Sequence, residues 1–382
     1  MKKLKIMSVF GTRPEAIKMA PLVRELAARE GFESLCCLTG QHREMLDSVM
    51  EIFRLRADYD LNIMQKQQTL SSITTRALLG MESVLGEAKP DLILVHGDTS
   101  TTFAGALAAF YQKIPVGHVE AGLRTYDPYS PFPEEMNRTL VGDIAALHFS
   151  PTAANAENLR REAVRGEIFI TGNTVIDAMK TTVRPDYRFT TQLLNELDFE
   201  GKRIIALTCH RRENYGQPMH DIFRAVREVV LTHPTVEVVY PVHLSPAVRD
   251  CAQEELGGVE RIHLIDPIDV EEMHNLMARC FFVMTDSGGL QEEAPAMGKP
   301  VLVLRRETER PEAVEAGTVK LAGVEYDNVV RLANALLEQP EEYEKMARAV
   351  NPYGDGNACR RIADAIEWHF GLRNDKPADF KA

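Results

Sequence analysis

The sequence lacks the features that mark membrane-bound, secreted or nucleic-acid-binding proteins. No apolar run approaches the roughly 18 residues that suggest a bilayer span, and the basic start MKKLKIMSVFGT leads directly into a strand-like segment without a cleavage pattern. Lysine and arginine number 44 against 56 aspartates and glutamates, which gives a formal net charge of −12. This balance argues against a nucleic-acid or membrane-surface partner. We therefore expect a cytoplasmic protein.

Metal-binding and redox patterns are absent too, as are several catalytic motifs. The six cysteines are scattered without a C-x-x-C pair, and the histidines show no clustered metal-ligand spacing. The sequence contains no G-x-G-x-x-G, G-x-x-x-x-G-K-[ST], H-E-x-x-H or G-x-S-x-G. A bound NAD, a P-loop kinase, a zincin and an α/β-hydrolase are therefore disfavoured. We expect no metal and no cofactor, and we expect the cysteines to be reduced core residues.

What is present is a long alternation of short apolar runs and amphipathic stretches. One hydrophobic core rarely grows beyond about 250–300 residues, so a chain of 382 residues should form two domains. Strands that alternate with helices form βαβ units, and nearly continuous apolar runs suit parallel strands covered on both faces. The pattern predicts an α/β protein with two doubly wound, Rossmann-like domains.

The alternation loosens between residues 171 and 202 and then resumes with a second series of strands. We place the first domain at 1–170 and the second at 171–356. The breakers NPYGDGN precede a helical pattern at 357–372, which we expect to pack back onto the first domain before a polar tail at 373–382. Because ligands bind beyond the carboxyl ends of strands in such sheets, we expect an interdomain cleft.

Polar side chains follow several strands of the first domain. After the first strand, GTRPEAIKMAP carries Arg13 and Lys18 around a helix start, where either could reach an anion. The alternative is a helix cap with solvent-exposed charges. Asp98, Glu120 and Glu134 lie on three further loops, of which SPFPEEMNR also contains Glu135. Although each acid could be only a cap, neighbouring acids can separate their pKa values and supply both acid and base, so we favour catalysis.

The second domain has cations and small residues after its strands. The strand RIIALT ends in CHRREN, where His210 and Arg211 suit phosphate recognition better than a surface salt-bridge cluster. Small residues at 287–289 let backbone amides approach a phosphate. Glu292 or Glu293 could accept hydrogen bonds from ribose, although acids are also common in a first helical turn. Arg310, in a second Arg-Pro-Glu sequence, offers another phosphate contact.

Nine segments in order resemble the bacterial non-hydrolysing UDP-N-acetylglucosamine 2-epimerases, from about Leu4 to about Phe370. They are GTRPEAIKMAP, QHREML, DLILVHGDT, PVGHVEAGLRT, SPFPEEMNR, HRREN, TDSGGLQEEAP, GKPVLVLR and TERPEAV. The resemblance implies a fold like that of the GT-B glycosyltransferases. It also implies reversible conversion of UDP-N-acetylglucosamine to UDP-N-acetylmannosamine without NAD, by UDP elimination to a 2-acetamidoglucal and re-addition. Such enzymes are usually homodimers and supply cell-envelope polysaccharide synthesis.

The resemblance also carries site residues onto this chain. The implied catalytic residues are Asp98, Glu120, Glu134 and His210. The implied substrate-binding residues are Arg13, Lys18, Asp98, Glu120, His210, Ile268, Met273, Ser287, Gly288, Gly289, Glu293 and Arg310. Relatives also bind UDP-N-acetylglucosamine as an activator in a second pocket, for which the candidates are Gln41, His42, Gln68, Arg211 and His243.

The sequence departs from relatives at two points. Gln67 stands where some carry a basic residue, which bears on activation, and Met273 stands where many present an aromatic ring near the uracil. Three alternatives stay open at this stage: a GT-B glycosyltransferase, a hydrolysing 2-epimerase and a nucleotide-sugar sensor without turnover. The retained acids disfavour the sensor, and the absence of a fused kinase domain disfavours the hydrolysing enzyme. Which carboxylate removes the C2 proton, and which returns it, stays undecided.

Overall fold

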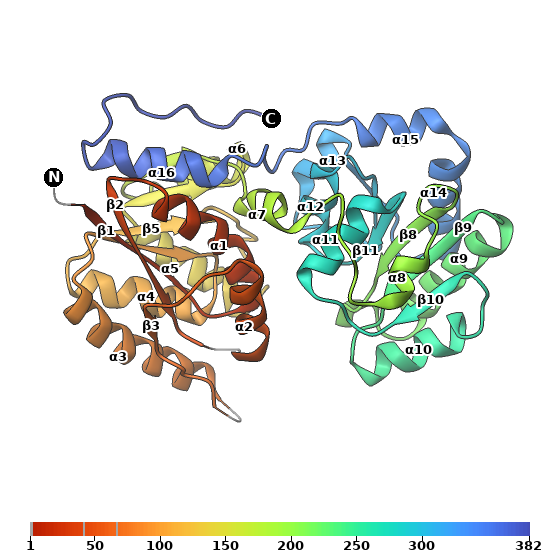
Figure 1. Cartoon of the computed structure of the whole chain (residues 1–382), viewed down its shortest axis with the longest axis horizontal. Coiled ribbons are helices and arrows are strands. Elements are labelled where there is room, and N and C mark those ends of the chain that lie inside the picture. The colour runs from red at the N-terminus through yellow and green to blue at the C-terminus, as the bar shows by residue number, and fades with distance from the viewer. Residues whose placement is uncertain (1–2, 41–42, 66–67) are drawn as a thin grey trace. The chain divides into compact units, whose positions relative to one another are not determined.

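The computed structural model (Figure 1) describes the chain except residues 1–2, 41–42 and 66–67 and the side chains of residues 43–45. The chain divides into two compact units. The N-terminal unit contains Met1–Thr181 and Tyr353–Ala382, and the C-terminal unit contains Thr182–Pro352. Both are layered α/β structures with a fully parallel sheet, which confirms the predicted fold class.

The sheet of the N-terminal unit has the order β3-β2-β1-β4-β5-β6-β7 over the described residues. Its strands are β1 (Leu4–Phe10), β2 (Phe32–Leu38), β3 (Tyr59–Asp60), β4 (Leu92–His96), β5 (Val116–Val119), β6 (Leu147–Ser150) and β7 (Glu167–Ile170). Its helices are α1 (Arg13–Ala27), α2 (Arg43–Ile52), α3 (Leu70–Ala88), α4 (Ser100–Tyr111), α5 (Glu134–Ile144), α6 (Ala153–Arg161), α7 (Thr174–Thr182) and α16 (Ala358–His369). The strand order reverses between β1 and β4, so a ligand crevice is expected there.

The sheet of the C-terminal unit has the order β10-β9-β8-β11-β12-β13, with its reversal between β8 and β11. Its strands are β8 (Arg203–Thr208), β9 (Val236–Pro241), β10 (Ile262–Ile265), β11 (Phe282–Thr285), β12 (Val301–Val303) and β13 (Val319–Leu321). Its helices are α8 (Gln192–Glu196), α9 (Gln217–Thr232), α10 (Pro246–Leu256), α11 (Val270–Arg279), α12 (Leu290–Ala296), α13 (Pro311–Ala316), α14 (Tyr326–Glu338) and α15 (Pro340–Ala347), with a 3₁₀ turn η1 at Arg212–Asn214.

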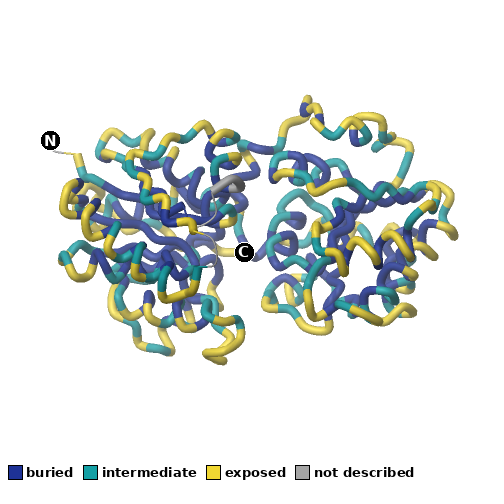
Figure 2. The backbone as a smooth tube through the Cα atoms, turned by 90° about the horizontal axis from the view of Figure 1, so that it is seen from below, coloured by how far each residue is buried: buried dark blue, intermediate teal, exposed yellow. Residues whose placement is uncertain are grey.

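Both sheets are covered by helices, as the continuous apolar runs predicted. Every residue of β4 is buried, and Figure 2 shows that buried residues gather in the interior of each unit. Each of the six cysteines is buried with a free thiol. None of the described helices is long and apolar enough to cross a membrane.

The units divide at different residues from those expected, because α7 and the chain end both pack on the N-terminal unit. The Asp177 carboxylate accepts hydrogen bonds from the backbone amides of Ala358 and Cys359, at 3.1 and 2.9 Å, which fastens α7 to α16. Residues 171–181 therefore belong to the first unit and not to the second. The tail also packs here, since Phe380 is buried and its amide donates to the Ile170 carbonyl at 2.7 Å.

Candidate active site

Three loops of the N-terminal unit emerge beside one another at the carboxyl ends of β1, β4 and β5. Val9 pairs with Val95, and His96 pairs with Val119, so the residues that follow each strand share one edge. The buried Glu15 fastens two of these loops together. Its carboxylate accepts from the amides of Gly11 and Thr12 after β1, and from the hydroxyls of Thr99 and Thr102 after β4. Glu15 thus fixes the loop that carries Arg13 against the loop that carries Asp98.

Glu120 is the most strongly constrained carboxylate at this edge. Its backbone is left-handed, with φ of 63°, and its Oε2 accepts from Lys18 Nζ and from Asn173 Nδ2, the latter at 3.1 Å. The ring of His96 places Nε2 3.3 Å from the same oxygen. Burial alone would raise the pKa of Glu120, but Lys18 and then His96 lower it well below its ordinary value, so the carboxylate is ionised. No group in the described part of the chain donates to its Oε1.

Asp98 is held by α5, the helix that carries Glu134 and Glu135. Arg138 on α5 contacts Asp98 Oδ2 through Nη2 at 2.7 Å and through Nε at 2.9 Å. The same guanidinium donates to the buried Glu135 at 3.1 Å, and Glu135 also accepts from two backbone amides, at residues 125 and 126. Glu135 is therefore occupied by structure, whereas the half-buried Glu134 has no side-chain partner among the described residues.

The backbone turn between β4 and Asp98 is hydrogen-bonded to a neutral histidine on β5. His118 on β5 is fully buried, and its Nε2 lies 2.7 Å from the carbonyl oxygen of Gly97. Because a carbonyl only accepts, Nε2 carries the proton. Burial lowers the pKa of His118 to about 3, against the smaller opposing effect of the Gly97 bond. The positive φ of Gly97, 66°, lets the chain turn there and present Asp98.

Arg13 is the open cation of this edge. It lies at the first position of α1, is half-buried, and has no ion-pair partner among the described residues. Lys18, predicted with it as an anion contact, pairs with Glu120. The edge therefore combines one available guanidinium with three carboxylates.

In the C-terminal unit, Asp286 organises the loop that follows β8. Asp286 is fully buried, and its Oδ2 accepts from the amides of His210 and Arg211, both at 2.8 Å, and from Asn214 at 3.1 Å. The His210 ring places Nδ1 3.4 Å from Asp286 Oδ1 and stacks on His243, with centroids 5.4 Å apart. Burial lowers the pKa of His210, although Asp286 opposes this. His210 is therefore a neutral, oriented imidazole at the reversal point of this sheet.

The turn after β11 brings two charged side chains against a pair of glycines. A Cβ at Gly288 would lie 3.2 Å from the Arg310 guanidinium, and one at Gly289 would lie 3.1 Å from Glu293 Oε1. Arg310 donates to Glu292 at 2.8 Å and to Glu309 at 3.0 Å. The guanidinium predicted to contact a phosphate is therefore paired with two carboxylates. Of the two candidate ribose acids, Glu292 is thus engaged with Arg310, whereas Glu293 contacts His274.

The remaining predicted residues are scattered over both units. Ile268 and Met273 are half-buried at the start of α11, and Ser287 is half-buried before α12. Gln68 accepts from Arg76 at 3.4 Å. Gln41, His42 and Gln67 lie outside the described residues.

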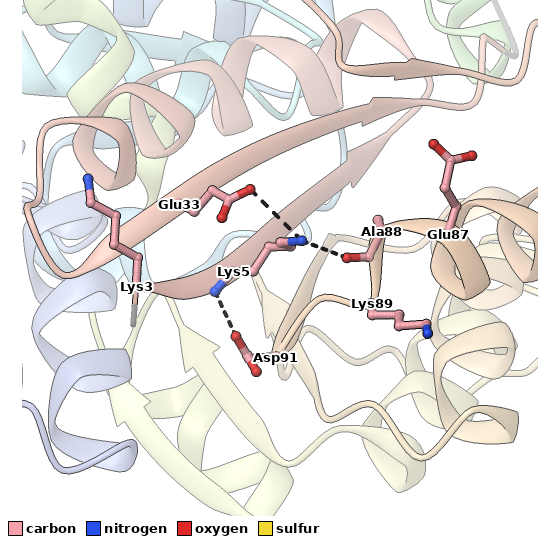
Figure 3. A pocket seen from close by; sticks show the side chains of 7 residues that line it. All are labelled: Lys3, Lys5, Glu33, Glu87, Ala88, Lys89 and Asp91. Carbon is pink, nitrogen blue, oxygen red and sulfur yellow. Dashed lines mark hydrogen bonds and ion pairs between the residues drawn. The ribbon is translucent and has the colours of Figure 1, made fainter. Parts of the chain in front are cut away.

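A hollow of about 430 Å³ lies at the opposite edge of the N-terminal sheet, where β1, β2 and β4 begin (Figure 3). Lys5 is the best-connected of its lining residues and pairs with Glu33, with 3.9 Å between Nζ and Oε1. The Lys5 amide donates to Asp91 at 2.8 Å, and the Lys5 ammonium donates to the Ala88 carbonyl at 2.9 Å. Because ligands of parallel sheets bind at the carboxyl ends of strands, we do not place the active site in this hollow.

One group of side chains has the spacing of metal ligands among the described residues, namely His220, Glu254 and Glu255. Arg224 and His220 both contact Glu255 Oε1, at 3.1 and 2.7 Å. A guanidinium on the ligand oxygen disfavours a second cation there. This group is therefore interpreted as an ion-pair cluster on α9 and α10.

Several residues that build the site were missed in the sequence. Glu15, His96, Asn173 and Asp286 were not assigned a role. Each follows or ends a strand, as the predicted residues do, so strand-end position was the available signal. What the sequence did not show is which of these groups face one another.

Two doubly wound units with carboxylates, cations and glycine turns at their strand ends are typical of α/β enzymes that bind phosphorylated ligands. The family model for UDP-N-acetylglucosamine 2-epimerase matches residues 24–367. A Bacillus subtilis UDP-N-acetylglucosamine 2-epimerase is 55% identical over 100% of this chain and 99% of its own. The chain belongs to the UDP-N-acetylglucosamine 2-epimerase family and is an isomerase of that class.

Solved structures agree with this assignment. An S. aureus protein in complex with UDP matches with a TM-score of 0.90 at 49% identity, over 99% of this chain and 100% of its own. The Neisseria meningitidis UDP-GlcNAc 2-epimerase bound to UDP-GlcNAc matches with a TM-score of 0.86 at 49% identity, over 95% of this chain and 99% of its own.

Proposed function

We propose that this enzyme interconverts UDP-N-acetylglucosamine and UDP-N-acetylmannosamine by eliminating and re-adding UDP. The observation that carries the mechanism is the ionised, half-buried Glu120 at one sheet edge with Asp98 and with Arg13, which has no ion-pair partner among the described residues. The substrate class is supported by the relatives that were solved with UDP and with UDP-GlcNAc. We place the reaction in the cytoplasm, where its product would supply cell-envelope polysaccharide synthesis.

The chemistry needs one base, one acid and a stabilised leaving group. A base takes the proton from C2, the C–H electron pair forms the C1–C2 double bond, and the C1–O pair leaves with UDP. Re-addition of UDP at C1 and of a proton at the opposite face of C2 gives the epimer. No redox step occurs, so no NAD is required.

The three carboxylates suit different parts of this reaction. A carboxylate with a lowered pKa stays charged but is a weak base. Glu120 therefore suits stabilisation of the positive charge that develops at the anomeric centre as UDP departs. We assign exchange of the C2 proton to Asp98 and Glu134, since Glu134 has no cationic partner in the described chain and Asp98 has Arg138 on one oxygen only.

UDP would be held mainly by the C-terminal unit. His210, oriented by Asp286, and Arg310 suit the diphosphate, and residues 287–289 offer backbone amides beside them. Glu293 suits the ribose hydroxyls, while Ile268 and Met273 at the start of α11 suit the uracil. At the strand-end edge of the N-terminal unit, Arg13 and Lys18 suit phosphate and sugar oxygens.

We further propose a second UDP-N-acetylglucosamine molecule as an activator, bound by Gln41, His42, Gln68, Arg211 and His243. The stacking of His243 on His210 supports this, because a ligand on His243 would act on a catalytic ring directly. Substituting His243 with alanine should flatten the dependence of rate on added UDP-N-acetylglucosamine. An unchanged rate curve would remove His243 from the activator site.

A homodimer is supported by exposed apolar side chains on three helices that pack together in the N-terminal unit. They are Leu79 on α3, Phe110 and Tyr111 on α4, and Met136 and Leu140 on α5. Single exposed apolar residues are common on protein surfaces and need no explanation, but five on neighbouring helices are typical of an interface. A second copy of the chain would bury them. Light scattering should show a dimer that Leu140→Lys converts to monomer, and a monomeric parent protein would contradict this part of the proposal.

The test of the main reaction is incubation of the protein with UDP-N-acetylglucosamine in D₂O, followed by NMR. We expect UDP-N-acetylmannosamine with deuterium at C2, and no deuterium in Asp98→Asn or Glu134→Gln. Free N-acetylmannosamine with UDP would instead indicate a hydrolysing enzyme. No reaction and no exchange would favour a glycosyltransferase or a sensor.

A further inference from the structure

Three side chains of the C-terminal unit, Thr182, His274 and Glu293, form a hydrogen-bonded series. Thr182, which ends α7 and is the first residue of this unit, places Oγ1 2.7 Å from His274 Nδ1 on α11. His274 Nε2 lies 3.2 Å from Glu293 Oε2 on α12. Thr182 is fully buried and His274 is 1% exposed, so His274 reaches neither solvent nor a ligand.

The hydrogen-bonding capacities of the three groups set the tautomer of His274. An ionised carboxylate only accepts, so Nε2 must carry the proton that points to Glu293. In the neutral ring Nδ1 then accepts, and the Thr182 hydroxyl can donate to it. Both ring nitrogens are thus satisfied by a single protonation pattern, in which the ring donates to Glu293.

The ring itself is held in place by its neighbour on α11. Asn275 donates to the Thr182 carbonyl at 2.7 Å and accepts from the Arg184 amide at 3.0 Å. These bonds fix the entering segment against α11, and with it the hydroxyl that contacts Nδ1. On the far side of Glu293, Oε1 lies over Gly289, where an added Cβ would come within 3.1 Å. The carboxylate is therefore fixed by His274 through one oxygen and faces the turn after β11 with the other.

We propose that His274 is a positioning residue that orients Glu293 toward the ribose and thereby sets the preference of the site for a ribonucleotide over a deoxyribonucleotide. This rests on the ribose contact proposed above for Glu293. His274 acts through Glu293 alone, since its burial excludes contact with substrate. Loss of the His274 bond leaves Glu293 charged and present but free to rotate away from the hydroxyls.

The test compares the affinities of UDP, 2′-deoxy-UDP and 3′-deoxy-UDP by calorimetry. Two substitutions separate orientation from packing. The amide nitrogen of glutamine can occupy the place of His Nε2, so His274→Gln should still donate to Glu293. Asparagine reaches only the place of Nδ1, so His274→Asn should not.

We expect the parent protein to bind UDP about ten-fold or more tightly than at least one deoxy ligand, as a hydrogen bond to a charged group provides. His274→Gln should keep most of this preference, and His274→Asn should reduce it to within about three-fold of unity. Turnover should show a raised KM with nearly unchanged kcat in His274→Asn, because the ribose does not change during the reaction. The matched control is His263→Gln, which alters a similar pair with Glu237, at 2.8 Å between β9 and β10, and should leave the preference intact.

Glu293→Gln separates failure of the inference from failure of the ribose contact. If Glu293→Gln keeps the full preference, the ribose contact itself is wrong and the inference falls with it. If Glu293→Gln loses the preference while His274→Asn keeps it, the ribose contact stands and the positioning role is overturned. Should His274→Asn not fold, Thr182→Val removes the donor to Nδ1, and we expect a several-fold reduction that Thr182→Ser restores; unchanged preference in Thr182→Val would then overturn the role.

Discussion

The neutral His118 beneath the Asp98 turn should make the N-terminal unit acid-sensitive. Its pKa is about 3 in the folded protein, against an ordinary value of 6.5. Between these two values the unfolded chain binds a proton that the folded chain does not. Stability is therefore fully present above the ordinary value, falls as the pH drops below it, and stops falling near the folded pKa.

The size of this effect follows from the proton linkage. Each pH unit between the two pKa values costs about 1.4 kcal/mol, so lowering the pH from 7 to 5 should remove about 2 kcal/mol through His118 alone. A marginally stable domain has about 5–15 kcal/mol in total, so the loss should be easily measured. His148, which burial also shifts to a lower pKa, should add in the same direction.

The assay is urea unfolding followed by tryptophan fluorescence at several pH values. The single tryptophan, Trp368, packs edge-on to Phe169 in the N-terminal unit, with centroids 6.1 Å apart, so its emission reports this unit. His118→Gln does not titrate but can keep the donor to Gly97. The difference in unfolding free energy between the parent and this variant should change by about 2 kcal/mol from pH 7 to pH 5. A difference independent of pH would refute the role of a buried neutral His118.

Three further substitutions address other parts of the site. Glu120→Gln should lower turnover by at least about 100-fold while UDP affinity changes little, because it removes charge used at the transition state; near-parental turnover would contradict this. Arg310→Ala should weaken UDP binding by about ten-fold or more in calorimetry, whereas the exposed Arg306→Ala should not, and equal affinities would remove Arg310 from the site. Glu15→Gln should cost about 2–4 kcal/mol of unfolding free energy, since the amide must face four donors; an unchanged urea midpoint would argue against the loop-fastening role.

Strand positions were predictable because they depend on short-range pattern. The run at 92–95 is apolar throughout, and the structure places it at the centre of a sheet with every residue buried. The predicted domain limits, 170 and 356, lie near the division of the structure into compact units at 181 and 352. Residues 171–181 look like a linker in sequence, yet Asp177 joins them to α16 through bonds that span 181 and 182 positions.

For the site residues too, position relative to a strand could be predicted from the sequence, whereas side-chain partners from distant segments could not. Asp98 and Glu120 could be singled out because both follow strands. Glu134 and Glu135 are indistinguishable by position, and only the structure shows that Glu135 is occupied by Arg138 and two backbone amides. Similarly, Arg310 was predicted as a phosphate contact, and only the structure shows that it also pairs with Glu292 and Glu309.

Charge pairing within the site follows from the charge of the expected ligand. A diphosphate is bound by cations. A cation that is partly buried without an ion-pair partner loses hydration and gains no compensating interaction. Lys18 with Glu120, and Arg310 with Glu292 and Glu309, avoid that cost through internal partners. A diphosphate that contacts Arg310 must compete with these acids, so removing the exposed partner by Glu309→Gln should tighten UDP binding. Weaker binding in Glu309→Gln would show instead that this acid orients Arg310 for the ligand.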